Sequence, residues 1–376
     1  MKNSVLLVGL FVIWFNMSCT QDAENKVSTP EEIPFSAELL IDEMQIPWGL
    51  EVLPDGGILV TEKSGEIIHF KDGKKTQISN VPEVYTRGQG GLMDIKLHPN
   101  YESNGWIYIS YASSEGEEKG GHTALMRAKL IDNSLTDNEL LYKAGPNTTK
   151  GQHFGSRIEF DYEGFLYLSI GERGARDENP QDITRDGGKI YRFYDDGRIP
   201  TDNPFVGTKD AKEAIFSYGH RNPQGMVVHP ETGEIWDNEH GPRGGDEINR
   251  IEAGKNYGWP KITYGINYNG TPITNDRALP GMEQPIHYWD PSIATSGMLI
   301  YSGDAFPNWK GNIFTGALKL MHLNRIALDE NNKVVAEERL LLDQKSRIRA
   351  IEQGPDGHIY VATDSYKGKI LKVSPR

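Results

Sequence analysis

The stretch LPDGGILVTE, residues 53–62, points to the fold, because the same phrase recurs along the chain. It combines a turn built on Pro, Asp or Asn and Gly with a following run of strand-forming residues. Asp-Gly or Asn-x-Gly supplies the positive φ of a tight turn, and alternating Ile, Leu, Tyr and Val fill one face of a strand. Each copy therefore predicts a β-hairpin. The further copies are LHPNYESNGWIYISY from Leu97, FDYEGFLYLSIGE from Phe160, VHPETGEIWDNE from Val228, AFPNWKGNIFTGAL from Ala305 and QGPDGHIYVATD from Gln353.

The spacing of these six copies predicts six structural repeats. The steps are 45, 63, 68, 77 and 48 residues between the markers Pro54, Pro99, Tyr162, Pro230, Pro307 and Pro355. This is roughly the size of a four-stranded propeller blade with insertions. Because a single blade cannot bury both of its faces, blades pack in a ring. We expect an all-β, six-bladed β-propeller whose central channel can hold a ligand, the place of the cofactor site that a resemblance discussed below implies. A β-sandwich with six chance hairpins is the alternative, which the even spacing disfavours.

The composition is that of one large globular domain. The chain has 376 residues, 37% of them hydrophobic, with 41 Gly and 21 Pro. The mean hydropathy of -0.55 excludes a protein with many membrane spans. A formal net charge of -13 disfavours nucleic acid as a partner, because a phosphate-binding surface needs a basic stripe.

The N-terminus is typical of an export signal. A lysine precedes an apolar run from Val5 to Phe15, and Cys19, the only cysteine of the chain, follows it. We expect a signal peptide over residues 1–19, a flexible tether over 20–35 and the propeller over 36–376. A sole cysteine there indicates a lipoprotein of the periplasm or outer membrane, attached peripherally to the membrane through a lipid anchor. Asn16 departs from the usual lipobox, so a cleaved signal with an incidental cysteine is the alternative.

The segment Ser217–Pro260 is unusually rich in Asn, Gly, Pro, Asp and Glu. Main-chain carbonyls at Gly241 and Pro242 and carboxylates at Asp246 and Glu247 are hard oxygen donors, the ligand type that Ca²⁺ prefers. No EF-hand spacing is present. From these residues alone, a calcium site and a plain acidic loop are equally consistent with the sequence.

From about Ile46 to Lys372 the chain resembles the glucose/sorbosone dehydrogenase family. That family contains soluble quinoprotein glucose dehydrogenase and the aldose sugar dehydrogenases, which use pyrroloquinoline quinone (PQQ). The resemblance implies a six-bladed propeller, in agreement with the repeats. It is carried, in the family's order, by IPWGLEVLPDG, GQGGLMDIKLHP, the His153 region, GHRNPQG, EHGPRGGDEIN, NYGWP, PSIATSGM and RIRAIEQGPDG.

The resemblance implies five cofactor-binding residues. PQQ carries three carboxylates, so its site must supply cations in an otherwise acidic protein. Arg347 and Arg349 are spaced i, i+2, which places both on one face of a strand, and together with Lys319 they match the family's basic residues. Gln89 and Asn222 match its glutamine and asparagine. Without the family, the same residues are consistent with a solvated strand face, a Gly-rich hairpin and an Asx-turn before proline.

The resemblance also implies a catalytic base and two calcium sites. His153 matches the base, although a lone loop histidine is ordinarily a surface residue. Main-chain carbonyls of Gly241 and Pro242 match the ligands of the active-site Ca²⁺. Glu247 and Tyr257 match ligands of a second, structural Ca²⁺. Glu172 stands where the soluble glucose enzyme has an aspartate near the histidine, so its role is open.

The resemblance implies the oxidation of an aldose to an aldonolactone. An imidazole with a pKa near 6.5 can accept the anomeric hydroxyl proton, while hydride moves to a quinone polarised by Ca²⁺. Electrons then pass to an external acceptor, a quinone or a cytochrome, since the chain lacks a haem-binding Cys-x-x-Cys-His motif. A propeller that only binds partners and a calcium-dependent lactonase are the alternatives. The lactonase would have no need of the cluster of Lys319, Arg347 and Arg349.

Overall fold

The structure, a computed structural model, describes residues 32–376. Within them, 24 strands form six four-stranded antiparallel sheets. This confirms the prediction of an all-β, six-bladed β-propeller. No helix of the described residues has the length and apolar character needed to span a bilayer. The predicted signal peptide with Cys19, and the tether up to residue 31, lie outside the described residues.

Each sheet is one blade, numbered here from the first strand along the channel. Blade 1 contains β2 (Pro47–Val52), β3 (Ile58–Glu62), β4 (Glu66–Lys71) and β5 (Lys74–Gln77), and blade 2 contains β6 (Leu92–Leu97), β7 (Trp106–Ser113), β8 (His122–Ile131) and β9 (Ser134–Lys143). Blade 3 contains β10 (Ile158–Phe160), β11 (Leu166–Ile170), β12 (Lys189–Phe193) and β13 (Ile215–Tyr218), and blade 4 contains β14 (Pro223–Val228), β15 (Ile235–Glu239), β16 (Asp246–Ile251) and β17 (His287–Trp289). Blade 5 contains β18 (Thr295–Ile300), β19 (Ile313–Ala317), β20 (His322–Leu328) and β21 (Val334–Leu340), and blade 6 contains β22 (Ile348–Gln353), β23 (Ile359–Thr363), β24 (Gly368–Pro375) and β1 (Phe35–Met44).

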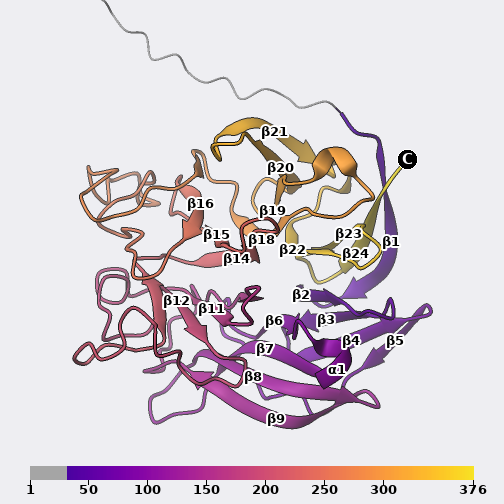
Figure 1. Cartoon of the computed structure of the whole chain (residues 1–376), viewed down its shortest axis with the longest axis horizontal. Coiled ribbons are helices and arrows are strands. Elements are labelled where there is room, and N and C mark those ends of the chain that lie inside the picture. The colour runs from indigo at the N-terminus through magenta and orange to yellow at the C-terminus, as the bar shows by residue number, and fades with distance from the viewer. Residues whose placement is uncertain (1–31) are drawn as a thin grey trace, which may run out of the picture.

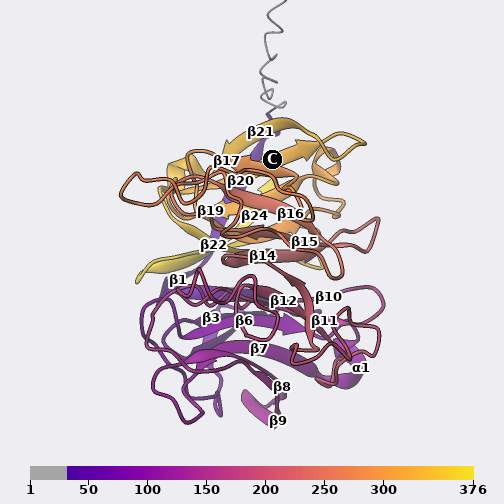
Figure 2. The same ribbon diagram turned by 90° about the vertical axis from the view of Figure 1, so that its left-hand side faces the viewer.

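The six blades form a closed ring around a central channel. Their first strands β2, β6, β10, β14, β18 and β22 contact one another in cyclic order, and β22 contacts β2. Figure 1 looks along the ring axis, and Figure 2 shows the blades from the side. All six first strands therefore begin at the same end of the channel, and the loops that lead into them meet there.

The repeated phrase marks the same place in every blade. Each copy spans the connection from the first strand to the second, as predicted. In blade 1 the Leu53 N–H donates to the Gly57 carbonyl at 2.7 Å, and Gly56 has a φ of 81°. Longer copies add a short helix, α1 (Tyr101–Asn104) in blade 2 and the 3₁₀ turn η1 (Pro307–Trp309) in blade 5. A second 3₁₀ turn, η2 (Leu342–Gln344), precedes β22.

The ring is closed by strands from opposite ends of the chain. β1 pairs with β24 in antiparallel register from Phe35 opposite Pro375 to Met44 opposite Gly368, and Figure 1 shows the indigo β1 beside the yellow β24. Ile41 and Met44 of β1 are 2% and 1% exposed. The N-terminal strand thus covers an edge that would otherwise expose unpaired backbone groups.

The hydrophobic core consists of layers between the blades. A separate cluster of buried side chains lies between each pair of neighbouring blades. Between blades 5 and 6, for example, the fully buried Trp309 stacks on Phe306 with ring centroids 3.9 Å apart. Because apolar burial is satisfied between blades, the channel itself can be lined with polar groups.

Removal of β1 is expected to destabilise the whole ring. A chain that starts at residue 45 loses Ile41 and Met44, each worth about 1.5–3 kcal/mol of burial, so its thermal midpoint should fall by at least about 5 °C. A chain that starts at residue 32 retains the strand and serves as the control. Equal midpoints in calorimetry of the two chains would contradict the role of β1 in closure.

Candidate active site

Two adjoining cavities open where the first strands begin. The first is lined by side chains from the starts of blades 1, 2, 4 and 6, and it encloses about 970 Å³ including its mouth. The second lies beside it over blades 3 and 4. They meet at Gln89 of the first cavity, whose Oε1 accepts a hydrogen bond of 2.6 Å from the backbone N–H of His153 in the second.

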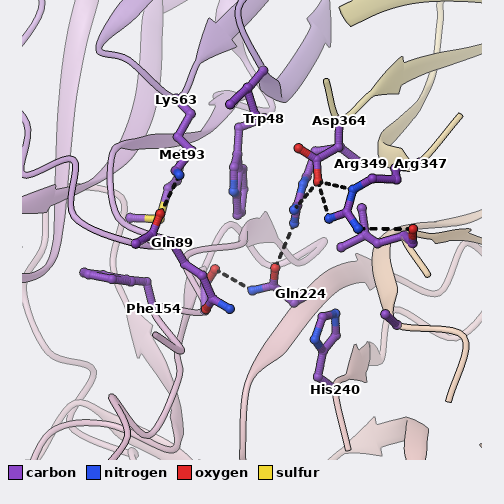
Figure 3. A pocket seen from close by; sticks show the side chains of 15 residues that line it. Trp48, Lys63, Gln89, Met93, Phe154, Gln224, His240, Arg347, Arg349 and Asp364 are labelled. Atoms are coloured by element: carbon purple, nitrogen blue, oxygen red, sulfur yellow. Dashed lines mark hydrogen bonds and ion pairs between the residues drawn. The ribbon is translucent and has the colours of Figure 1, made fainter. Parts of the chain in front are cut away.

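A pair of arginines forms one wall of the first cavity (Figure 3). Arg347 precedes β22 and Arg349 lies within it, so the predicted i, i+2 spacing does bring both guanidinium groups together. Their Nη2 atoms lie 2.7 Å and 2.9 Å from the same Asp364 oxygen. Arg349 also donates to Gln224 Oε1 at 3.0 Å. The wall is therefore a rigid, hydrogen-bonded cluster of charges.

The charge of this wall is positive overall. Burial by itself raises the pKa of Asp364, but Arg349 and Arg347 outweigh it and hold that pKa below its usual range. Asp364 thus stays ionised and neutralises one of the two arginines. Lys63, on the turn after β3, adds a third cation to the lining. The buried Nε of Arg349 has no hydrogen-bond partner among the described residues. This donor set fits an acidic cofactor.

Trp48, in the lining of the first cavity, packs against two guanidinium groups. Its ring centroid lies 5.7 Å from the Arg349 guanidinium and 4.2 Å from that of Arg157. Arg157 is held in turn by Asp94 at 2.8 Å and by the Gln224 carbonyl at 2.6 Å. The sequence reasoning missed Trp48, Arg157 and Lys63. For Trp48, its place in the IPWG motif was the only available signal.

His153 lies in the second cavity, within the loop that leads into β10. Its Nδ1 contacts Oε1 of Glu172, a residue of the loop that follows β11. The His153 side chain is 14% exposed and that of Glu172 is 2% exposed. A carboxylate can only accept a hydrogen bond, so Nδ1 carries the proton and Nε2 has the free lone pair. Glu172, whose role was open, orients the imidazole.

Burial and a neighbouring arginine keep His153 neutral. Burial lowers the pKa of His153 most, the positive charge of Arg221 lowers it further, and Glu172 acts in the opposite direction. The net result is a pKa below the usual value. Arg221 is itself only 6% exposed and donates to the His240 carbonyl at 3.0 Å. It lines the second cavity, although the sequence reasoning selected only its neighbour Asn222.

Two predicted cofactor residues lie outside both cavities. Asn222 is 1% exposed, and its Oδ1 accepts a hydrogen bond of 3.1 Å from the Gly155 N–H, which ties blade 4 to the loop before blade 3. Lys319 is exposed in the turn after β19, next to the cavity-lining Leu318. The cofactor roles of Asn222 and Lys319 stay predictions.

The loop between β15 and β16 fits a calcium ion. The carbonyl oxygens of Gly241 and Pro242 accept no hydrogen bond from residues 32–376, and Pro242 lines the second cavity. Asp246 shapes this loop, because its two oxygens accept hydrogen bonds from Gly241 at 2.9 Å and Ala294 at 2.6 Å. The carboxylate of Asp246 is thus already used by the backbone. Two free carbonyls beside a polar cavity are suitable ligands for a hard cation.

A buried acidic group lies behind this loop. Glu247 and Tyr257 line one small pocket together with Glu239. Burial first, and then the neighbouring Glu239 and Asp246, raise the pKa of Glu247 well above its usual value. The pKa of Asp237 is raised in the same way by burial and Glu239. Such an excess of buried carboxylates fits the predicted second cation. The alternating Asp237 and Glu239 of β15 were not singled out from the sequence.

Comparison with known proteins agrees with this geometry. Residues 44–372 match the family described as glucose / sorbosone dehydrogenase. The chain belongs to the glucose/sorbosone dehydrogenase family. It is 43% identical to aldose sugar dehydrogenase YliI of Escherichia coli, over 91% of this chain and 93% of that protein.

Solved structures extend the comparison from sequence to fold. The apo-form of the soluble aldose sugar dehydrogenase of Escherichia coli matches with a TM-score of 0.87 and 42% identity, over 91% of this chain and all of that one. The PQQ-bound aldose sugar dehydrogenase of Streptomyces coelicolor matches with a TM-score of 0.72 and 25% identity, over 92% of this chain and all of that one. Our chain is therefore an oxidoreductase of the sugar dehydrogenase type.

Replacement of Asp364 by Asn is expected to destabilise the empty protein at neutral pH. The change leaves Arg349 buried beside Arg347 without its ion pair, at a cost of about 3 kcal/mol. Because the pKa of Asp364 is lowered in the folded chain, this stabilisation is present above the carboxyl group's unfolded pKa and is lost as the pH falls through the lower folded value. The free energies of unfolding in urea should therefore differ between the variant and the native chain at pH 7 and become equal in acid.

The control for this prediction is Asp304→Asn. Asp304 pairs with Lys310 at the surface, and its side chain is 96% exposed, so little effect is expected at any pH. A loss of stability in Asp364→Asn that did not change with pH would rule out the ion pair as its cause.

Proposed function

We propose that the chain oxidises the anomeric hydroxyl of aldose sugars to aldonolactones, with PQQ in the first cavity and Ca²⁺ on the carbonyls of Gly241 and Pro242. The observation that carries the proposal is the contact of His153 with Glu172, which places an oriented, neutral imidazole beside a cationic cavity. Family membership and the similarity to a PQQ-bound aldose sugar dehydrogenase support it.

The cationic wall of the first cavity would hold the cofactor. Arg347, Arg349 and Lys63 are the groups that can pair with its carboxylates. Trp48 offers a flat, apolar surface next to two guanidinium groups that are held by hydrogen bonds. When bound, PQQ supplies a quinone that accepts two electrons and hydrogen from the substrate.

His153 would act as the general base of the reaction. Its Nε2 would accept the proton of the anomeric hydroxyl, and the bound quinone would supply the acceptor for the hydride of the same carbon, so that the sugar would lose two electrons and two hydrogens and become a lactone. The Glu172 carboxylate accepts the hydrogen bond from the Nδ1–H of His153 and stabilises the imidazolium that forms. Gln89 accepts a hydrogen bond of 2.6 Å from the backbone N–H of His153 and would thereby help to position the imidazole at the junction of the cavities.

Electrons would leave for an external acceptor, a quinone or a cytochrome. An exported enzyme with a lipid anchor at Cys19 would work in the periplasm or at the outer membrane, where such acceptors are available. The sugar is selected in the second cavity, whose wall includes Arg176, Trp259 and Asn267. Arg176 donates to Asn267 at 3.0 Å and so links the loops of blades 3 and 4 across this cavity.

Replacement of His153 by Ala is expected to abolish aldose oxidation. Loss of a general base lowers kcat by about 100- to 10,000-fold, whereas cofactor binding should persist because the arginine wall is untouched. Dye-linked oxidation is measured with PQQ and Ca²⁺ added or omitted, and PQQ binding is measured separately by titration.

The control for this replacement is His358→Ala. His358 lies in the β22–β23 turn at the opposite end of the channel, so full activity is expected. A chain that binds no PQQ and oxidises no aldose would overturn the proposal, and lactone hydrolysis or partner binding would then be assayed.

Replacement of Glu172 by Gln is expected to lower kcat and change its pH dependence. The neutral amide no longer fixes the tautomer, which should cost at least about tenfold in kcat. The carboxylate raises the pKa of His153, so its loss should move the acidic limb of the pH profile of kcat/KM to lower pH. Glu163→Gln, in the β10–β11 turn at the far end of the channel, should leave the profile unchanged. An acidic limb that moved upward would contradict this assignment.

A further inference from the structure

A buried arginine lies directly beneath the loop that carries His153. Arg173 is 1% exposed, and its guanidinium group lies over the ring of Phe154, 3.3 Å from the centroid. It donates hydrogen bonds to three backbone carbonyls, those of Gly121 at 3.1 Å, Lys150 at 2.9 Å and Gln152. Two of these three carbonyls belong to the loop of His153.

This buried cation has no ion pair. Within residues 32–376 no carboxylate lies within 4 Å of the Arg173 guanidinium, and its Nε is buried without a hydrogen-bond partner. The neighbouring Glu172 points to His153 instead. Burial lowers the pKa of Arg173 to about 10, which still leaves it charged at neutral pH. A buried, unpaired charge is costly, so a structural role alone accounts for it poorly.

The loop that Arg173 holds is in an unusual conformation. His153 has a φ of 56°, in the left-handed region that residues other than glycine adopt only when their surroundings hold them there. The backbone N–H of Arg173 donates to the His153 carbonyl at 3.3 Å, and Gln89 accepts from the His153 N–H on the other side. The loop is thus fixed on either side of His153, and Phe154, stacked on Arg173, lines the first cavity.

We propose that Arg173 is a positioning residue that holds His153 at the junction of the two cavities, and that its unpaired charge favours the neutral form of the imidazole. The catalytic part of this inference rests on the proposed role of His153 as the base. Lys150, Arg176, Asp177 and Glu178 also line the second cavity. The groups that act most strongly on the charge of His153 are Arg221, Glu172 and Arg173, and the imidazole of His240 also interacts with it. Among these strongest groups, Glu172 alone favours the charged imidazolium. Loss of Arg173 would remove one of the cations that counteract Glu172, so the imidazolium would become more favourable.

Two variants distinguish the effect of Arg173 on the position of His153 from the effect of its charge. Arg173→Lys keeps the charge but cannot reproduce the planar set of donors to three carbonyls. Arg173→Met removes both. In each, the titration of His153 is followed by NMR of its imidazole in the protein without cofactor, with the signal assigned by its loss in His153→Ala. Steady-state kinetics with PQQ, Ca²⁺ and an aldose, and PQQ binding by titration, complete the measurements. Arg325→Met is the matched control, because Arg325 is a buried arginine, 5.7 Å from the Trp309 ring in blade 5.

For Arg173→Lys we expect kcat to fall by about tenfold or more with the His153 titration unchanged, since small displacements of a reacting group are costly. For Arg173→Met we expect a further loss, and titration of His153 at higher pH than in the native chain. PQQ affinity should change less than kcat in both variants.

The inference is overturned if Arg173→Met leaves both kcat and the titration unchanged, or lowers only the thermal midpoint, as Arg325→Met should. The NMR titration requires no activity. If the native chain oxidised no aldose, the proposed function would fail while the effect of Arg173 on His153 could still be measured.

Discussion

The closed ring is the constraint on which the rest of this structure depends. Four twisted strands expose two apolar faces, and only a complete circle of blades covers all of them. Pairing of β1 with β24 completes that circle with strands from opposite ends of the chain. Closure also makes all six first strands start at one end of the channel, so loops far apart in sequence meet there.

This geometry explains how an acidic chain builds a cationic cavity. The net charge is -13, yet Arg347, Arg349 and Lys63 converge on one cavity with Asp364 as the single opposing carboxylate in its lining. Carboxylates gather instead behind the β15–β16 loop, where Asp237, Glu239 and Glu247 lie together. The channel end thus separates positive from negative charge over a short distance. The proposed anionic cofactor and the proposed cations would then be held side by side.

In the second cavity, a solvent-accessible side chain is supported by buried ones. His153 is exposed enough to reach a substrate, whereas Glu172 and Arg173, its partners from the loop after β11, are almost completely buried. His153 is therefore held by groups that solvent does not reach. Such support keeps the imidazole in one tautomer and one position, as the proposed proton transfer would require.

The sequence by itself determined the blade count, because the hairpin phrase is a local signal: a positive-φ turn and an alternating strand need no distant partner to be recognised. Its family motifs also pointed to His153, Gln89 and the pair Arg347 and Arg349, which lie at the two cavities. The tertiary structure alone decided the supporting groups. Lys63, Arg157 and Arg173 carry no local signature, since an isolated arginine or lysine in sequence is ordinarily a solvated residue, and for Trp48 the IPWG motif was the only signal. Their roles arise only when ring closure brings them together with residues from other blades. For Asn222 and Lys319 the motifs suggested the cofactor site, but the tertiary structure puts them outside both cavities. Asn222 is packed between blades, and Lys319 lies in an exposed turn.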